Sequence, residues 1–256
     1  MNPLITSAVV KFMDQLGYKI IPKWRVKNFE IATHTRKLIN LFGINCVLDV
    51  GANLGQYGEF LRTEVGYTGQ ILSFEPVKRV FNQLKLNSRK DPLWYVYPFA
   101  FGSENGNINI NITKSDRLNS FLHPKESGLL LENYNIDDSN SIIGSESVEV
   151  KTIDSFFEEE NSIIDLKNSH IFLKLDTQGY DTYVINGGKN TLSKIYAIQS
   201  EISCIPIYQG MEDYIKSLEK LRILGFDVTG MFPVSRDQWN RVVEFDFLGI
   251  NRNKII

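Results

Sequence analysis

The chain has 256 residues, with 28 basic against 30 acidic side chains and a formal net charge of −2. Because no basic run is interleaved with aromatic residues, the composition argues against a nucleic-acid partner. The sequence lacks a signal-peptide pattern and any apolar run near the roughly 18 residues of a membrane span, which predicts a cytoplasmic protein with no transmembrane segment. Cys46 and Cys204 lack metal-ligand spacing, so we expect thiols and no metal site.

The length suits one α/β domain with an N-terminal helical extension, and we expect the boundary between residues 1–45 and 46–256. In the extension, apolar residues at helical spacing predict a helix that covers one edge of the core, with a membrane-surface anchor as the alternative. A second helix is predicted over Phe29–Phe42, with one face turned inward. The stripe of the first helix consists of Val9, Val10, Phe12, Met13 and Leu16.

A strand of apolar residues then runs directly into a turn bracketed by glycines, and a helical pattern follows. The first turn of such a helix directs backbone N–H groups over the strand end, where an anionic group is stabilised. A nicotinamide or flavin fingerprint would need two further glycines in this turn, at the positions of Asn53 and Gln56. With Asp49 before the turn and Gly51 and Gly55 in it, the pattern resembles the first motif of class I S-adenosylmethionine-dependent methyltransferases.

A second short strand is predicted over residues 70–74, and it ends in Glu75. A carboxylate at the tip of a second parallel strand is placed to accept charge-assisted hydrogen bonds from a pair of ribose hydroxyls. The alternative roles for Glu75 are a contact at the start of the next helix and a surface salt bridge. Pro76 stops the strand, and the apolar spacing after it predicts a helix.

The middle of the chain continues the alternation of strands and helices that is typical of a doubly wound sheet. A third strand over residues 93–101 is followed by a turn and a half-buried strand over residues 107–112, which together predict an appended antiparallel hairpin. Residues 114–147 have little periodicity, and we expect either a lid loop or disorder. A strand is predicted over residues 148–153, and Asp154 is expected to cap the short helix after it.

The most apolar strand, residues 170–175, ends in Asp-Thr-Gln-Gly at residues 176–179. This sequence, the first motif, Phe-Glu-Pro at residues 74–76 and Gln-Ser-Glu-Ile-Ser at residues 199–203 together resemble the FkbM-type methyltransferases. The similarity continues in order to the Phe-Asp-Phe-Leu sequence at residues 245–248. The first motif is common to many methyltransferases, whereas the combination is specific.

The resemblance implies a Rossmann-like α/β fold of class I methyltransferases. This fold has a seven-stranded, mostly parallel sheet with an antiparallel edge strand and helices on both faces. The resemblance also implies an enzyme that binds S-adenosylmethionine and methylates a hydroxyl oxygen of a small molecule or of a sugar in a glycan.

The resemblance further assigns the parts of the cofactor site. Glu75 would hold the ribose, and Ala100 and Phe101, at the end of the third strand, would line the adenine side. The loop around the methionine end would contain Asp49, Gly51, Asn53 and Gly55.

Two acids at successive strand ends are the candidate catalytic residues. The resemblance implies that Asp176 lies where the methyl group is transferred, and Glu201 is expected at the end of the next strand. An alcohol is a poor nucleophile until a base removes its proton. Many members of the family carry Glu at the positions of Gln178 and Asp181. The role of base is therefore expected of Asp176 or Glu201, while Gln178 orients an oxygen by hydrogen bonds. The structural alternatives are helix capping or pairing with Lys174 for Asp176, and pairing with a neighbouring base for Glu201.

Other functions and other residues are less favoured by the sequence. A methyltransferase for nucleic-acid bases would need an Asn/Asp-Pro-Pro-aromatic sequence after the central strand, which is missing. The alternatives are a non-catalytic domain that binds the nucleoside as a regulatory module and a methyltransferase that acts on another acceptor atom. His34 and His170 are expected to be structural, and His123 to be a solvated loop residue.

Overall fold

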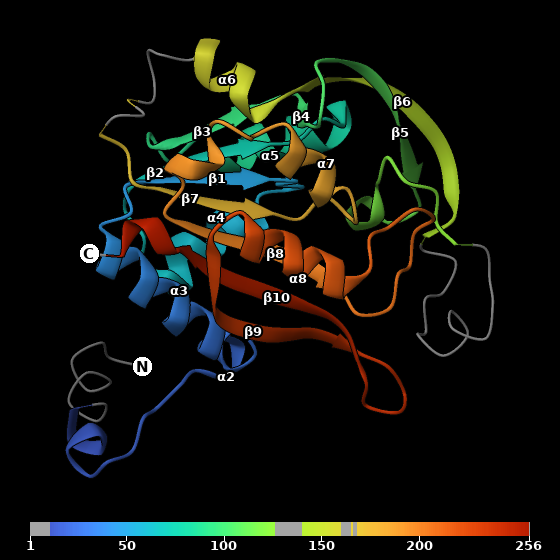
Figure 1. Ribbon diagram of the computed structural model, residues 1–256. Coiled ribbons are helices and arrows are strands. Elements are labelled where there is room, and N and C mark those ends of the chain that lie inside the picture. Colours follow the sequence, from blue (N-terminus) through green and yellow to red (C-terminus); the bar gives the residue numbers. More distant parts are fainter. Residues whose placement is uncertain (1–10, 126–139, 160–164, 166–167, 256) are drawn as a thin grey trace.

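The computed structural model describes residues 11–125, 140–159, 165 and 168–255, and its centre is a seven-stranded sheet in the order β3-β2-β1-β7-β8-β10-β9 (Figure 1). The first five strands in this order are parallel to one another. They are β3 (Trp94–Tyr97), β2 (Gln70–Phe74), β1 (Cys46–Val50), β7 (Ile171–Leu175) and β8 (Ala197–Ser203).

The other two strands close one side of this sheet. β10 (Val242–Asn251) is antiparallel both to β8 and to β9 (Phe226–Arg236), so β9 runs in the same direction as the parallel strands. The predicted seven-stranded, mostly parallel sheet is therefore confirmed. The predicted position of the antiparallel strand at the edge is wrong. β10 lies one position inside the edge, because it inserts between β8 and β9.

Helices cover both faces of the sheet, as predicted. Successive residues of a strand point to opposite faces, and accordingly Leu48 packs in one hydrophobic cluster and Val47 in another. One cluster includes residues of α6 (Ile153–Glu159), α7 (Asp181–Asn186) and α8 (Tyr214–Ile223). The other includes residues of α3 (Phe29–Phe42), of the π-helical turn η1 (Leu61–Val65), which continues α4 (Gln56–Phe60), and of α5 (Lys78–Ser88).

Helix α3 has the predicted bounds and the predicted inward face. Thr35, Leu38 and Ile39 are buried, which follows from their spacing on one side of the helix. The helix ends at Gly43, which adopts a left-handed conformation with φ 57° and donates its N–H to the last turn.

The predicted third strand is divided in the structure. β3 ends at Tyr97, and β4 (Ala100–Phe101) belongs to a separate three-stranded sheet in the order β4-β6-β5. The interruption coincides with Pro98, which has no N–H to donate to a neighbouring strand. The predicted hairpin is wrong, because β4 and β5 (Gly106–Thr113) lie on opposite sides of β6 (Ile142–Lys151).

The long connection between β5 and β6 is shorter than predicted. Strand β6 begins at Ile142, so it includes residues that we had assigned to the loop. The described part of the loop contains the 3₁₀ turn η2 (Asp116–Leu118). Residues 126–139 lie outside the described residues, and the choice between a lid and disorder falls on them.

Asp154 does not cap the helix that follows it. It lies within α6, and its carboxylate accepts hydrogen bonds from the backbone N–H groups of Asn190 and Thr191, at 3.1 and 2.9 Å. Thr152 takes the predicted role instead, because its hydroxyl accepts from the N–H of Ser155 at 3.0 Å. The side chain of Asp154 therefore stabilises the loop that follows α7.

The N-terminal stripe does not cover the core in the part of the chain that the structure describes. Residues 11–15 are helical, but Phe12 and Leu16 are 60% and 56% exposed. The predicted packing against an edge of the core is therefore wrong for these two side chains, while Val9 and Val10 lie outside the described residues. Within those residues, none of the helices combines the length and the apolar character that crossing a membrane requires.

Candidate active site

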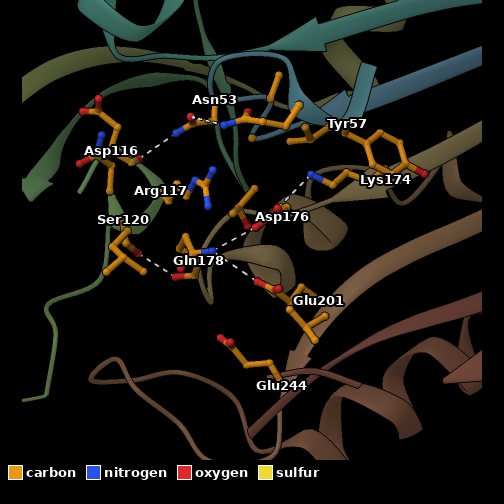
Figure 2. Close-up of a pocket in the computed structure, with 18 of the residues that line it drawn as sticks. Asn53, Tyr57, Asp116, Arg117, Ser120, Lys174, Asp176, Gln178, Glu201 and Glu244 are labelled. Atoms are coloured by element: carbon orange, nitrogen blue, oxygen red, sulfur yellow. Dashed lines mark hydrogen bonds and ion pairs between the residues drawn. The ribbon is translucent and has the colours of Figure 1, made fainter. Parts of the chain in front are cut away.

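A cavity of about 770 Å³ lies at the carboxyl ends of the central parallel strands (Figure 2). Gly51, Glu75, Asp176 and Glu201 line it. The first three directly follow β1, β2 and β7, and Glu201 lies in the second half of β8. Ligands of open α/β sheets bind at this edge, and the volume is in the range of small-molecule sites. The other walls come from the start of α3, from η2 and the residues after it, and from the β9–β10 hairpin.

Gly51 allows two strand ends to approach each other at the floor of the cavity. Its φ is 78°, and a Cβ added there would lie 1.9 Å from the backbone oxygen of Asp176. Neither the conformation nor the space admits another residue. The first glycine of the predicted motif is thus required by the contact between β1 and β7.

The loop after Gly51 is fastened to the end of β2. The N–H groups of Gly51 and Ala52 donate to the carbonyl of Phe74 at 3.1 and 3.0 Å, and the N–H of Asn53 donates to Glu75 Oε2 at 3.0 Å. These three amides therefore do not form an open anion cradle, which differs from the expectation for this loop. The loop presents the side chains of Asn53 and Gln56 to the cavity.

Glu75 faces the cavity from the tip of β2, although only 6% of the residue is exposed. Its second oxygen, Oε1, accepts from the N–H of Val77 at 2.9 Å, so the contact with the start of α5 is present. Burial raises the pKa of this carboxyl to about 7, although the amides of Val77 and Asn53 favour the charged form. Each oxygen has a second lone pair that is free to accept from a ligand.

Ala100 and Phe101 lie in the cavity wall, as predicted. The ring of Phe101 packs against Phe74 with a centroid distance of 4.5 Å, and Phe156 packs edge-on against Phe74. This gives the cavity an apolar side next to Glu75. A flat aromatic base would bury its faces there.

Asp49 and Gly55 lie behind the cavity and do not line it. Asp49 is fully buried, accepts from the Ser73 hydroxyl at 2.9 Å and lies 3.5 Å from the ammonium of Lys174. Burial raises the pKa of Asp49, and the attraction of Lys174 opposes this shift. Gly55 turns the chain at φ 94°, where a Cβ would meet Leu84 at 2.9 Å. Both residues therefore stabilise the loop from the side that faces away from the cavity.

A chain of polar contacts crosses the opposite end of the cavity (Figure 2). Lys174 Nζ lies 3.1 Å from Asp176 Oδ2, so the alternative of an ion pair for Asp176 is present. The amide Nε2 of Gln178 donates to Asp176 Oδ1 at 3.0 Å and to Glu201 Oε2 at 3.3 Å. Glu201 therefore meets an amide here, where the structural alternative expected a basic residue. Asp176, Gln178 and Glu201 are brought together as the sequence predicted.

Electrostatics at this end are dominated by burial and by mutual repulsion of carboxylates. Burial, together with the charges of Asp176, Glu244 and Asp246, raises the pKa of Glu201 well above its ordinary value. For Lys174, burial works against the charged form, but the attraction of Asp176 and other carboxylates outweighs it and raises the pKa. Lys174 therefore stays charged and holds the carboxylates near it.

Several residues of this wall were not predicted from the sequence. Glu244 and Asp246 reach the cavity from β10, and burial raises the pKa of Asp246 to about 6. Asp246 accepts from Gln199, whose amide oxygen accepts from the hydroxyl of Tyr57 at 2.8 Å. The alternation of residues 244–248 indicated that both acids share one face of a strand, but it did not indicate which face.

The segment around η2 forms the cover of the cavity. The side-chain amide of Asn53 donates to the carbonyl of Asp116 at 2.9 Å, and the hydroxyl of Ser120 donates to the carbonyl of Gln178 at 2.8 Å. Between these two attachments, Arg117 points into the cavity (Figure 2). The described part of the long loop is therefore connected to both ends of the site.

The remaining candidates can be placed outside the site. His170 Nδ1 lies 2.6 Å from the carbonyl of Phe42, and His34 Nε2 lies 2.9 Å from the hydroxyl of Thr229, so both are structural as predicted. His123 is exposed and does not line the cavity. Among the residues described, no group of three or more His, Cys, Asp or Glu side chains is arranged to hold a metal ion.

Comparison with known proteins identifies a family. A family model described as methyltransferase FkbM domain matches residues 49–228, which is more than half of the chain. This match begins in β1 and ends in β9. It includes Glu75, Asp176 and Glu201. A search of curated proteins found no match.

The solved structures that match this chain are distant from it. A methyltransferase FkbM from Methylobacillus flagellatus KT has a TM-score of 0.47 and 13% identity, covering 80% of this chain and 43% of the other. The chain thus spans less than half of that protein. A magnesium protoporphyrin IX methyltransferase from Synechocystis PCC 6803 with bound SAM has a TM-score of 0.45 and 7% sequence identity, and the match covers 96% of both chains. Aeropyrum pernix fibrillarin in complex with S-adenosyl-L-methionine has a TM-score of 0.41 and 10% sequence identity, and the match covers 84% of this chain and 74% of the other.

Proposed function

Because the chain belongs to the FkbM methyltransferase family, we propose that its cavity binds S-adenosylmethionine and directs the methyl group to a hydroxyl oxygen. We further propose that the acceptor is a small molecule or a sugar of a glycan. One observation carries this proposal. A single cavity joins the buried carboxylate of Glu75 to a second set of carboxylates, Asp176 and Glu201, which Gln178 bridges.

The residues of the cofactor end fit this ligand. Glu75 offers two carboxylate oxygens to a ribose diol, and the wall of Ala100 and Phe101 offers an apolar face to adenine. Gly51 and Asn53 would lie along the methionine end. In this proposal Asp49 and Gly55 act indirectly, because Asp49 positions Lys174 and Gly55 shapes the turn.

The acceptor end supplies the groups that oxygen methylation needs. When bound, S-adenosylmethionine supplies an electrophilic methyl group on a positively charged sulfur. The sulfur becomes a neutral thioether once the methyl group has been transferred. The protein has to hold an acceptor oxygen in line with this methyl group and exclude water. Asp176 would accept the hydroxyl proton, Gln178 would orient the oxygen, and Glu201 would provide a second acceptor for the proton.

The composition of this wall also favours a hydroxyl-rich acceptor. Carboxylates of Glu201, Glu244 and Asp246 line the cavity, and each accepts hydrogen bonds. Each of them already accepts a hydrogen bond within the protein, from Gln178, Ser235 and Gln199 respectively, and each has further lone pairs that an apolar acceptor would leave without donors. A sugar, which carries several hydroxyl donors, satisfies them.

Two further parts of the proposal concern organisation. We propose that residues 46–256 form the catalytic domain and that residues 1–45 are its helical extension. The alternative of a non-catalytic domain that binds the nucleoside as a regulatory module differs from our proposal in one respect, since such a domain would bind the cofactor without transferring its methyl group.

Calorimetric titration with S-adenosylmethionine and with NAD tests the ligand. We expect binding of S-adenosylmethionine, and a loss of about a hundredfold in affinity in Glu75→Ala, because two charge-assisted hydrogen bonds disappear. Glu59→Ala, on an exposed position of α4, is the matched control. Tighter binding of NAD than of S-adenosylmethionine would refute the assignment.

Transfer of a tritiated methyl group to a panel of sugars and small alcohols tests the chemistry. In Asp176→Asn we expect unchanged cofactor affinity and a loss of turnover of about a hundredfold or more, since the proton acceptor is removed. Equal turnover in this variant would exclude Asp176 from the mechanism. Cofactor binding without transfer to any acceptor of the panel would favour the regulatory module.

A further inference from the structure

Residues 11–27 form an arm that leaves the body of the protein before α3. Figure 1 shows this segment extending beyond α2 (Lys23–Val26), away from the seven-stranded sheet. None of the four residues of α2 is buried. The function proposed above does not use this N-terminal arm.

The apolar side chains of the N-terminal arm are exposed to an unusual degree. Trp24 is 65% exposed and Tyr18 is 63% exposed, and four further apolar residues of the arm are more than two fifths exposed. Large apolar side chains that gather on a surface mark an interaction site. The four other residues are Phe12, Leu16, Ile20 and Val26.

The charge of the arm is opposite to that of the rest of the chain. Its cations are Lys11, Lys19, Lys23, Arg25 and Lys27, against one acid, Asp14. The arm therefore has a formal charge of +4, and since the whole chain has −2, the remainder has −6. An anionic surface would attract the arm and repel the body, which fixes the orientation of approach.

The arm is anchored next to one wall of the cavity. Arg25 donates to the carbonyl of Glu64 at 2.6 Å, and Asn28, the next residue after the arm, donates to the Glu64 carboxylate at 3.0 Å. Lys27, Asn28 and Ile31 line the cavity itself. A surface bound by the arm would therefore lie close to this wall of the cavity.

We propose that the N-terminal arm docks the protein on an anionic membrane surface. Aromatic residues with polar edges, such as Trp24 and Tyr18, are suited to the headgroup layer. The lysines next to them in the sequence, Lys19 and Lys23, are attracted by the phosphates of anionic lipids. A groove on a protein partner would bury the apolar residues but leave the interspersed lysines to be desolvated, which is costly. The occupant that satisfies both sets of side chains is a lipid surface.

Co-sedimentation of the full chain with vesicles tests this proposal. We expect binding to vesicles of equimolar phosphatidylcholine and phosphatidylglycerol at least about tenfold tighter than to phosphatidylcholine alone, and weaker binding at high salt. The variant Lys11→Glu, Lys19→Glu, Lys23→Glu is expected to lose about a hundredfold in affinity for the anionic vesicles. Trp24→Ala is expected to weaken binding severalfold at unchanged charge.

The control variant carries the same change of charge at the carboxyl end of α5 and just after it, at exposed positions far from the arm in sequence. Lys85→Glu, Arg89→Glu, Lys90→Glu is expected to bind vesicles like the unmodified protein. Thermal unfolding and titration with S-adenosylmethionine should not distinguish the arm variants from the unmodified protein, so failure here is separable from failure of the proposed function.

Three outcomes would overturn the proposal. One is equal binding to neutral and anionic vesicles, or none to either. A second is equal loss of binding in the arm variant and the α5 variant. The third is a dimer, measured by sedimentation, that Trp24→Ala dissociates while vesicle binding is absent, which would assign the arm to a second copy of the chain.

Discussion

The two ends of the cavity are built in different ways. At the cofactor end, Gly51, Asn53 and Glu75 come from two consecutive strand-to-helix connections and are held by backbone hydrogen bonds. At the acceptor end, Asp176 and Glu201 come from the paired strands β7 and β8, and the side-chain amide of Gln178 connects their carboxylates. Changes at the first end should therefore alter folding and cofactor affinity, and changes at the second should alter turnover. The predictions below test this contrast, from the largest effect to the smallest.

Gly51→Ala should have the largest effect. A Cβ would lie 1.9 Å from a backbone oxygen in a conformation with φ 78°, so we expect a loss of about 3 kcal/mol or more in the free energy of unfolding. Urea denaturation measures this quantity. Gly106→Ala is the control, because nothing lies within 4 Å of its added Cβ. Equal stabilities of the two variants would show that β1 and β7 are free to separate.

Glu75→Gln should change how stability depends on pH. Burial raises the pKa of Glu75 from 4.5 to about 7, so between these values the folded protein keeps a proton that the unfolded chain has released. Stability is therefore full below about pH 4.5 and falls as the pH rises towards 7, by about 3 kcal/mol from this group. In the variant this part of the decrease should disappear.

Urea denaturation at pH 5 and pH 8 isolates this contribution when the unmodified protein is compared with Glu75→Gln. Other buried acids, such as Asp246, contribute equally to the two proteins and cancel in the difference. Glu59→Gln, at an exposed position, should retain the full decrease. A decrease of equal size in Glu75→Gln would contradict the prediction.

Glu201→Gln should reduce turnover about tenfold while leaving cofactor affinity unchanged, because a neutral amide does not accept the hydroxyl proton. The pKa of Glu201 is raised well above its ordinary value by burial and by neighbouring carboxylates. Methyl transfer by the unmodified protein should therefore increase with pH as this group loses its proton. The profile of the variant should be flatter, and an identical profile would exclude Glu201.

Tyr208→Phe should have the smallest effect. The hydroxyl of Tyr208 lies 3.1 Å from Gln178 Oε1, and its loss removes one partner of the side chain that we propose to orient the acceptor. We expect the KM for the acceptor to increase about threefold to tenfold. Cofactor affinity should not change. A change in cofactor affinity instead would indicate that the two ends of the cavity are mechanically coupled.

Features that depend on residues close together in the chain were determined by the sequence. The glycine turn, the placement of Glu75 at a strand tip and the bounds of α3 all follow from local spacing. The family followed as well, because its motifs are contiguous stretches of sequence. Local hydrogen bonding and side-chain periodicity determine these features wherever the segment lies.

Tertiary structure alone decided which side chains reach the cavity. β1 and β7 are buried on both faces, so their sequences do not tell which residue points where, and Asp49 lies behind the cavity while Lys174 lines it. Glu244 and Asp246 enter because β10 inserts between β8 and β9. Phe12 remains exposed although its spacing suggested burial. Burial depends on pairings between distant segments, and local spacing does not contain that information.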